Sequence, residues 1–204
     1  MERRRLLDLP HSDNLIFYAP LDNISGNKEI LHDITPITES GCSAAYNSAE
    51  NKYLLYAYNS SGGNTKAALV YQNIGFSIQN GSPMTMALDM KEVSLYSIYQ
   101  TAMSCPRYLS AQPCIIRHSF YAANTSPING RFVVTYSQDV GGSQIGKWYK
   151  DGVLIHTQSL ATRELSDYVT LCETAATAGH NYRFYAGNAR IWNIEMTAEE
   201  VANL

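Results

Sequence analysis

Several features that mark common classes of protein are missing from this sequence. Only 16% of its 204 residues are charged, the formal net charge is -3, and the single basic run comprises Arg3, Arg4 and Arg5. A nucleic-acid-binding domain needs clustered Lys and Arg and a basic pI. No apolar run approaches the roughly 18–20 residues that span a bilayer. We therefore expect neither a nucleic-acid partner nor insertion into a membrane.

The start of the chain also lacks the pattern of a secretory signal. Its first residues, MERRRLLDLPHSDN, are interrupted by Asp8 and Pro10. This leaves no apolar core of about 7–15 residues. The sequence does not identify a compartment, but it favours a cytoplasmic or virion-associated protein over a secreted one.

Cysteine is sparse and scattered, at positions 42, 105, 114 and 172. No two of these residues have the C-x₂-C spacing of a zinc site. Because no export signal is evident, reduced and mostly buried thiols are favoured over disulfides. Cys105 and Cys114 flank a Pro-containing segment and form the pair to test first.

What the sequence does contain is alternation of apolar and polar residues. In SPMTMALDMKEV, the residues Met84, Met86, Leu88 and Met90 fall on one face of a strand. We expect this methionine stripe to belong to the core. CIIRHSFYAAN alternates in the same way, and no segment before the C-terminus has a helical period. The sequence therefore predicts an all-β protein.

Two segments predict hairpins. In KWYKDGVLIHT, Asp151-Gly152 fits a two-residue type I′ turn, which needs positive φ at both positions. This turn would place Lys150 opposite Val153, Tyr149 opposite Leu154 and Trp148 opposite Ile155. In KYLLYAYNSSGGNTKAALVY, two apolar runs flank a Ser- and Gly-rich segment, which indicates a second, longer hairpin.

The C-terminus predicts a strand followed by a short helix. Residues 189–193 alternate as a half-buried strand does. Thr197 and Glu200 have the spacing of a capping box, and Met196 and Val201 have that of a hydrophobic staple. Such a short helix is marginal alone, so it must dock on a larger body.

Three segments, FYAPLDN, GRFVVTYSQD…KWYKDGVLI and FYAGNARIWNIEMTAEEVANL, together resemble a concanavalin A-like domain of the laminin G and pentraxin kind. Two departures are Gly130-Arg131, where the family often has Trp-His, and Met196 in place of leucine. The resemblance implies a jelly-roll sandwich of two antiparallel sheets, one of them often concave, with the closing strand beside the first. We expect a polar tail over residues 1–14 and one such domain over 15–204.

Catalysis is not expected. The superfamily includes glucanases with an E-x-D-x-x-E pattern, and the nearest match here is Asp89 with Glu92. An odd offset places these side chains on opposite faces of a strand, and the first glutamate is replaced by Ala87. Glycosidases need two carboxyl groups facing one another. No G-x-S-x-G elbow or H-E-x-x-H pair is present either.

Glycan binding is the expected function, on a concave sheet or its rim loops. If the apolar faces pack inward, the opposite faces present Thr85 and Ser119 together with residues that could hydrogen-bond to a sugar or stack against it. The predicted ligand-binding residues are Asp89, Tyr96, Tyr99, Tyr108, Arg117 and Tyr121. The alternative for each tyrosine is that its ring only packs against cross-strand neighbours and binds no ligand.

No cofactor is predicted, although pentraxin-like proteins hold calcium through clustered oxygen ligands. The loop residues that offer such oxygens are Asp22, Asn23, Asp33 and Asp139. Two alternatives to a glycan-binding module stay open. One is a structural or adhesion protein, such as a bacterial-virus virion or tail-associated domain with a virion or cell-surface partner. The other is a glucan hydrolase.

Overall fold

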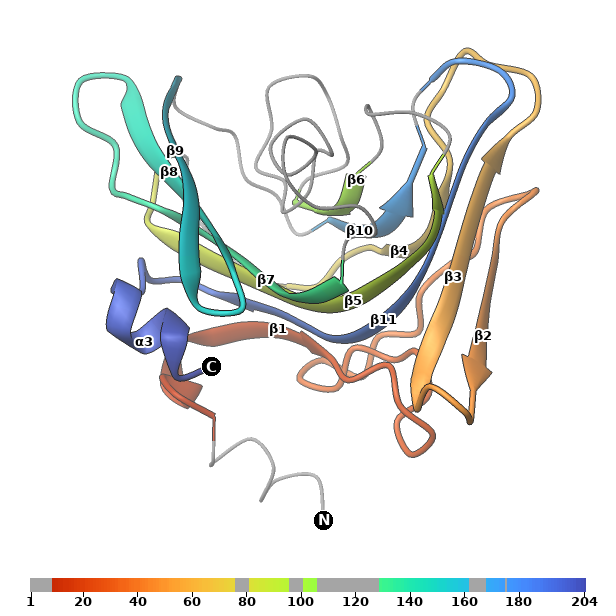
Figure 1. The fold of residues 1–204 in the computed structure, drawn as a ribbon, viewed down its shortest axis with the longest axis horizontal. Helices are drawn as coiled ribbons and strands as arrows, with labels where there is room; N and C mark the ends of the chain where they lie inside the picture. The colour runs from red at the N-terminus through yellow and green to blue at the C-terminus, as the bar shows by residue number, and fades with distance from the viewer. Residues whose placement is uncertain (1–8, 76–80, 96–100, 106–128, 162–167, 175) are drawn as a thin grey trace.

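The computed structural model describes residues 9–75, 81–95, 101–105, 129–161, 168–174 and 176–204. Its regular secondary structure is almost entirely β-strand, arranged as two antiparallel sheets that pack face to face (Figure 1). This confirms the prediction of an all-β sandwich with a short C-terminal helix. The elements are η1 (Ser12–Asn14), β1 (Leu15–Ala19), β2 (Ser43–Asn47), β3 (Lys52–Asn59), β4 (Ala67–Tyr71), β5 (Met84–Leu95), β6 (Thr101–Ser104), β7 (Asn129–Tyr136), β8 (Ser143–Lys150), β9 (Val153–Ala161), β10 (Val169–Glu173), β11 (His180–Trp192) and α3 (Ala198–Ala202).

The large sheet has the strand order β2-β3-β11-β5-β7-β8-β9, and the small sheet has the order β4-β10-β6. Figure 1 shows the large sheet curving like a cup around the small one. β11 is long enough to pair with β3 along its first half and with β1 along its second half. The closing strand therefore lies beside the first strand, as the resemblance to concanavalin A-like domains implies.

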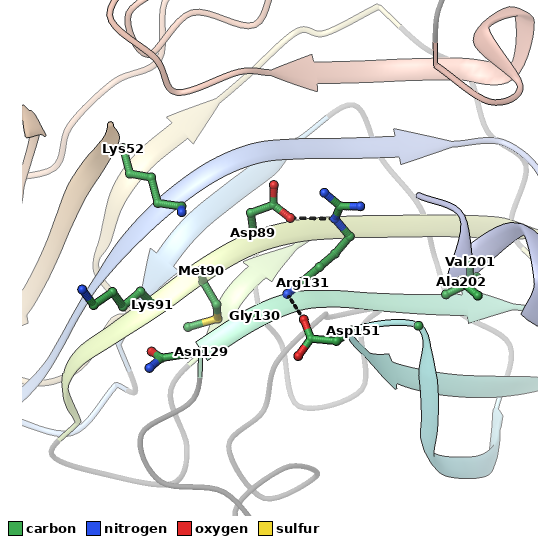
Figure 2. Close-up of a pocket in the computed structure, with 11 residues that line it drawn as sticks. Lys52, Asp89, Met90, Lys91, Asn129, Gly130, Arg131, Asp151, Val201 and Ala202 are labelled. Atoms are coloured by element: carbon green, nitrogen blue, oxygen red, sulfur yellow. Dashed lines mark hydrogen bonds and ion pairs between the residues drawn. The ribbon is translucent and has the colours of Figure 1, made fainter. Parts of the chain in front are cut away.

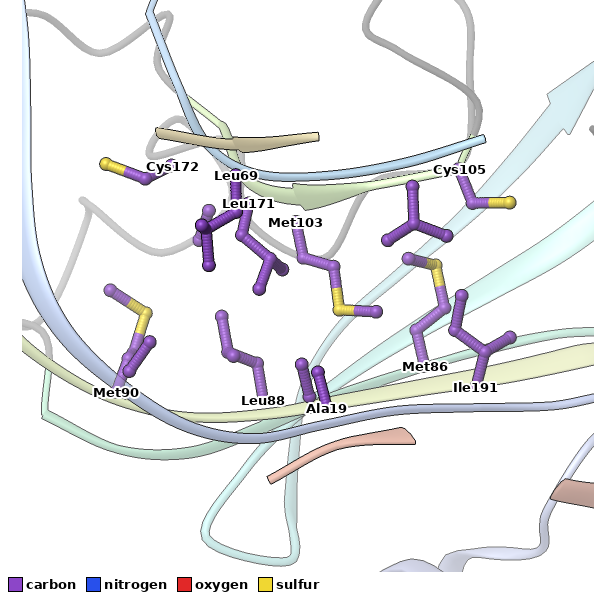
Figure 3. Packing of buried hydrophobic residues seen from close by; sticks show 14 of the residues in the cluster. Ala19, Leu69, Met86, Leu88, Met90, Met103, Cys105, Leu171, Cys172 and Ile191 are labelled. Carbon is purple, nitrogen blue, oxygen red and sulfur yellow. The ribbon is translucent and has the colours of Figure 1, made fainter. Parts of the chain in front are cut away.

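The core lies between the two sheets. Met84, Met86, Leu88 and Met90 all point inward from β5 and are at most 2% exposed. They face side chains of the small sheet, among them Leu69, Met103 and Leu171 (Figure 3). The methionine stripe is therefore core, as predicted from its alternation.

A second, smaller apolar cluster lies on the outer, convex face of the large sheet, beneath α3. It is made of Leu15, Tyr18, Ala87, Val133, Tyr149, Trp192, Met196 and Val201. The predicted capping box is present, since Thr197 accepts from the Glu200 backbone N–H while the Glu200 carboxylate accepts from the Thr197 N–H. Residues N-terminal to β1 also reach this region, because Trp192 Nε1 donates to the Pro10 carbonyl.

The prediction that Thr85 faces solvent is wrong. Thr85 does point to the outer face, but the segment before α3 covers it completely. Its hydroxyl donates to the Ile194 carbonyl at 2.8 Å and accepts from the Met196 backbone N–H at 3.0 Å. Alternation gives the face of a strand, not what later lies over that face.

Three details of strand pairing also differ from the expectation. The predicted hairpin around residues 59–64 does not form, because β3 belongs to the large sheet and β4 pairs with β10 in the small one. The predicted closing strand at residues 189–193 is not a separate element, because residues 189–192 are the end of β11, which starts at His180 and continues through a bulge. At the Asp151-Gly152 turn, two of the three predicted pairs are confirmed. Trp148, however, lies opposite His156 because of a second bulge.

No helix among the described residues is long and apolar enough to cross a membrane.

Cys172 is a buried thiol whose Sγ donates to the Tyr182 carbonyl at 3.4 Å. Burial raises its pKa well above the usual value, so this thiol stays protonated. Cys114, and with it the predicted Cys105–Cys114 pair, lies outside the described residues.

Candidate functional site

The outer face of the large sheet carries a polar depression beside the apolar cluster under α3. Two adjoining pockets, of about 540 and 430 Å³, share Lys52 and Asp89. We call this surface the Asp89 depression. The charged and amide side chains that line it are Asp22, Glu50, Asn51, Lys52, Asp89, Lys91, Asn129, Arg131, Asp151 and Asn188.

Asp89 organises the centre of the depression. One carboxylate oxygen accepts from Arg131 Nε at 2.8 Å (Figure 2). The other accepts from Asn188 Nδ2 at 2.8 Å. Asn188 lies at the bulge of β11 with a φ of 51°, and its side-chain oxygen accepts from the Tyr18 hydroxyl. Three strands and a bulge therefore hold one hydrogen-bonded network of planar carboxylate, guanidinium and amide groups.

The turn between β8 and β9 closes one end of the depression. Asp151 Oδ1 accepts from the Arg131 backbone N–H at 2.8 Å. The carboxylate lies directly on Gly130, where an added Cβ would be 2.6 Å from Asp151 Oδ2. Gly130 thus makes room for Asp151, and Arg131 supplies the guanidinium for Asp89.

Lys52 is the cation that the depression leaves without a counter-ion among the described residues. Its aliphatic stem crosses β11 at Gly187, where an added Cβ would lie 3.6 Å from Lys52 Cγ. Figure 2 shows its ammonium group extending over β11 on the side of Asp89. Neighbouring Lys91, in contrast, pairs with Glu50 at 2.6 Å.

A buried guanidinium lies behind this network. Arg190 is 6% exposed, and its guanidinium lies over the Tyr18 ring at 5.4 Å. Burial lowers the pKa of Arg190, while Tyr18 and Asp89 partly oppose this shift. Arginine stays charged in proteins. A second guanidinium, buried and charged, therefore lies near Asp89 in addition to that of Arg131.

Tyrosines follow the same outer face beyond Lys52. Tyr56 and Tyr58 lie on β3 with ring centroids 6.4 Å apart and ring planes 13° apart. Tyr185 on β11 lies beneath Lys91, whose Nζ is 5.9 Å from the ring centroid. All three rings are partly exposed. We call Tyr56, Tyr58 and Tyr185 the tyrosine stripe.

Among the predicted ligand-binding residues, only Asp89 lies in the described part of the chain, and it lies in the depression. Tyr96, Tyr99, Tyr108, Arg117 and Tyr121 fall outside the described residues, as does Ser119, so their roles stay predictions.

Sequence analysis missed the partners of Asp89 and the tyrosine stripe. One signal was available, because alternation from the buried Leu55 assigns Lys52, Tyr56 and Tyr58 to the outer face. No sequence signal brings Asn188 and Arg131 to Asp89.

The loop oxygens considered for calcium are used within the chain. Asp22 and Asp139 accept from backbone N–H groups, and Asp33 pairs with Lys28 at 2.7 Å. Within the described ranges, no group of three or more His, Cys, Asp or Glu side chains could hold a metal ion. Asn23 lines a separate surface pocket together with Asp33.

No protein-family model and no curated protein matches this chain. Solved structures do, and three that cover 94% of it at 14% identity are botulinum neurotoxin structures. One is the serotype D ligand-binding domain in complex with N-acetylneuraminic acid, with a TM-score of 0.55. Another is the binding domain of neurotoxin DC in complex with rat synaptotagmin II, at 0.60. The third is neurotoxin type C, whose cell entry depends on interaction with two ganglioside molecules, at 0.61.

This chain spans about half the length of those chains, 50% to 51%. At such low identity the likeness shows a shared fold, a β-sandwich found in binding domains. Membership of the concanavalin A-like or laminin G family stays a prediction.

Proposed function

We propose that this protein is a non-catalytic glycan-binding module and that the Asp89 depression is part of its binding surface. The observation that carries the proposal is the set of planar polar groups held rigidly by Asp89. Sugar hydroxyls are bound by such groups when these are fixed before binding. Within the described residues, no hydrogen bond is made by the terminal nitrogens of Arg131 or by the exposed amide of Asn129. These groups are therefore available to hydrogen-bond with sugar hydroxyl groups.

The comparisons support a binding role. The solved neighbours are binding domains, and two of them are described with N-acetylneuraminic acid or gangliosides. The geometry of β5 gives no support to hydrolysis, since Asp89 faces outward and Glu92 lies on the opposite face. There Glu92 raises the pKa of the buried Tyr182, which burial already raises.

The test is a glycan array followed by calorimetric titration of the best ligand. We expect Lys52→Met to weaken binding at least about fivefold, because it removes the uncompensated ammonium but keeps the stem on Gly187. Lys28→Met, at a lysine outside the depression, is the matched control and should bind normally. Failure of any glycan to bind the folded protein would refute the proposal, as would equal affinities of the two variants. A reducing-sugar assay should show no turnover.

One observation favours a second candidate function, assembly into a larger structure. β9 pairs only with β8 among the described residues, and Val153, Leu154 and Ile155 are 65%, 49% and 43% exposed. Exposed apolar edge strands tend to pair with other chains. If this edge assembles, light scattering should show association that rises with concentration and is lost in Leu154→Lys. A monomer at all concentrations would remove this candidate.

A further inference from the structure

The outer face of β3 is continuous from the Asp89 depression to the tyrosine stripe. Lys52, Leu54, Tyr56 and Tyr58 alternate with the inward residues Leu55 and Ala57, so the four share one face. From Lys52 to Tyr58 there are six steps along the strand, or about 20 Å at roughly 3.3 Å per residue. A surface of this length suits a short oligosaccharide better than a single sugar.

The tyrosine rings along this face are arranged so that a sugar chain could pack against them. Tyr56 and Tyr58 are one strand repeat apart and nearly parallel. Across the sheet, Tyr185 pairs with Leu54, and Arg183 pairs with Tyr56. Partly exposed tyrosines offer an apolar ring face and a polar hydroxyl together, which matches the mixed surface of a pyranose.

Along β3 and the neighbouring part of β11, the charges without an ion-pair partner among the described residues are positive. Asp89 is paired with Arg131, and Glu50 is paired with Lys91. Arg183 is exposed beside Tyr56, and neither it nor Lys52 has an ion-pair partner in the described part of the chain. Two further carboxylates line the depression and accept from backbone N–H groups, Asp151 at its β8–β9 end and Asp22 in the pocket that also contains Asn188. An anionic ligand is therefore favoured along β3 and disfavoured towards Asp151 and Asp22.

We propose that the ligand is an acidic oligosaccharide, with sugar rings against Tyr56 and Tyr58 and carboxylate or sulfate groups paired with Lys52 and Arg183. The inference rests on the proposed function, because it names the class of glycan and the direction in which it extends from the depression. Arg183 suits this role because its planar guanidinium binds carboxylate or sulfate through two hydrogen bonds and can also stack on a ring.

The experiment compares glycans that differ only in charge. Calorimetric titrations would use hexagalacturonate against its methyl ester, and a heparin hexasaccharide against its fully desulfated and neutralised form. At least one acidic member should bind about tenfold or more tightly than its neutral counterpart, with an affinity that falls as salt is raised. Arg183→Gln should weaken only the acidic ligand, by about tenfold, and Lys28→Gln should change nothing.

A second pair of variants tests the rings. Tyr56→Ala and Tyr58→Ala should weaken binding of the hexasaccharide more than binding of a disaccharide, because a disaccharide fits within the depression. Thermal melts would establish that each variant is folded. Equal binding of neutral and acidic glycans, unchanged by Arg183→Gln, would overturn this inference and leave the proposed function standing. Binding of no glycan at all would overturn both.

Discussion

At the scale of single residues, the candidate site depends on close approaches that only a few side chains allow. Asp151 can lie on Gly130 because Gly130 has no Cβ and adopts a φ of 133°. The carboxylate then accepts from the Arg131 backbone, and the Arg131 side chain turns to Asp89. Gly130 is therefore needed because it leaves room for the Asp151 carboxylate.

Gly130→Ala tests this arrangement. A Cβ at this position would be 2.6 Å from Asp151 Oδ2 and would sit on a backbone that L side chains rarely adopt. We expect a loss of about 1–3 kcal/mol in the free energy of unfolding, measured by urea denaturation. Gly141→Ala is the control, since its φ is 65° but the space around it is open. Equal losses in the two variants would show that Asp151 does not matter.

Buried polar residues show the limit of sequence analysis at this scale. Glu29 is fully buried, and its carboxylate accepts from the backbone N–H groups of Tyr18, Leu31 and His32. A buried charge is tolerated only where hydrogen bonds of this kind compensate it. Nothing in the segment NKEILHD distinguishes this glutamate from an exposed one.

At the scale of elements, the short helix α3 is stabilised from both its ends and its face. Thr197 and Glu200 form the capping box, and Met196 and Val201 belong to the outer apolar cluster. The turn at Gly152 packs against the helix so closely that a Cβ there would lie 2.9 Å from Ala202 Cα.

Removing the cap should weaken this docking. In Thr197→Ala the hydroxyl that accepts from the Glu200 N–H is lost, which should cost about 1 kcal/mol in chemical denaturation. Thr157→Ala, an exposed position on β9, is the control and should cost less than about 0.5 kcal/mol. If both variants were as stable as the parent, α3 would contribute nothing to global stability.

The same cap predicts a dependence of stability on pH. The hydrogen bond from the Thr197 backbone to Glu200, aided by His11, lowers the pKa of Glu200 below its usual 4.5. Because the folded pKa is the lower one, this contribution is complete above about pH 4.5 and is lost as pH falls through the folded value. It is small, since Glu200 is largely solvated.

Glu200→Gln keeps an acceptor but does not titrate, so it isolates this contribution. The stability advantage of the parent over Glu200→Gln, followed by thermal melts from about pH 6 to pH 3, should shrink as pH falls. A stability difference that did not change with pH would show that ionisation of Glu200 does not contribute to the stability of the fold.

At the scale of the whole molecule, stability comes from the contact between the two sheets. Met103 points from the small sheet between Met86 and Leu88 of the large one (Figure 3). The polar outer face can be open because the inner face supplies this core. The proposed binding surface and the main core therefore lie on opposite faces of the large sheet.

Met103→Ala should remove part of this contact. Met103 is fully buried, so we expect a loss of about 2–5 kcal/mol in urea denaturation. Val140→Ala, at a position that is 79% exposed, should lose less than about 0.5 kcal/mol. A small loss for Met103→Ala would mean that the sheets separate or repack at little cost.

Much of the fold follows from local sequence, because alternation and turn chemistry act over a few residues. The methionine stripe, the turn at Asp151-Gly152 and the cap at Thr197 all belong to this class. The predicted hairpin between β3 and β4 failed for a related reason. A Ser- and Gly-rich loop shows that the chain turns, not which sheet the next strand joins.

The sequence by itself determined that strands dominate, that Met84 to Met90 face a core and that Asp89 faces away from it. Only the tertiary structure decided what Asp89 meets, since Arg131 and Asn188 are 42 and 99 positions away. The physical reason is that strand pairing brings distant segments together and bulges shift their register. Neither the partner strand nor the bulge is encoded in the alternation of any one strand.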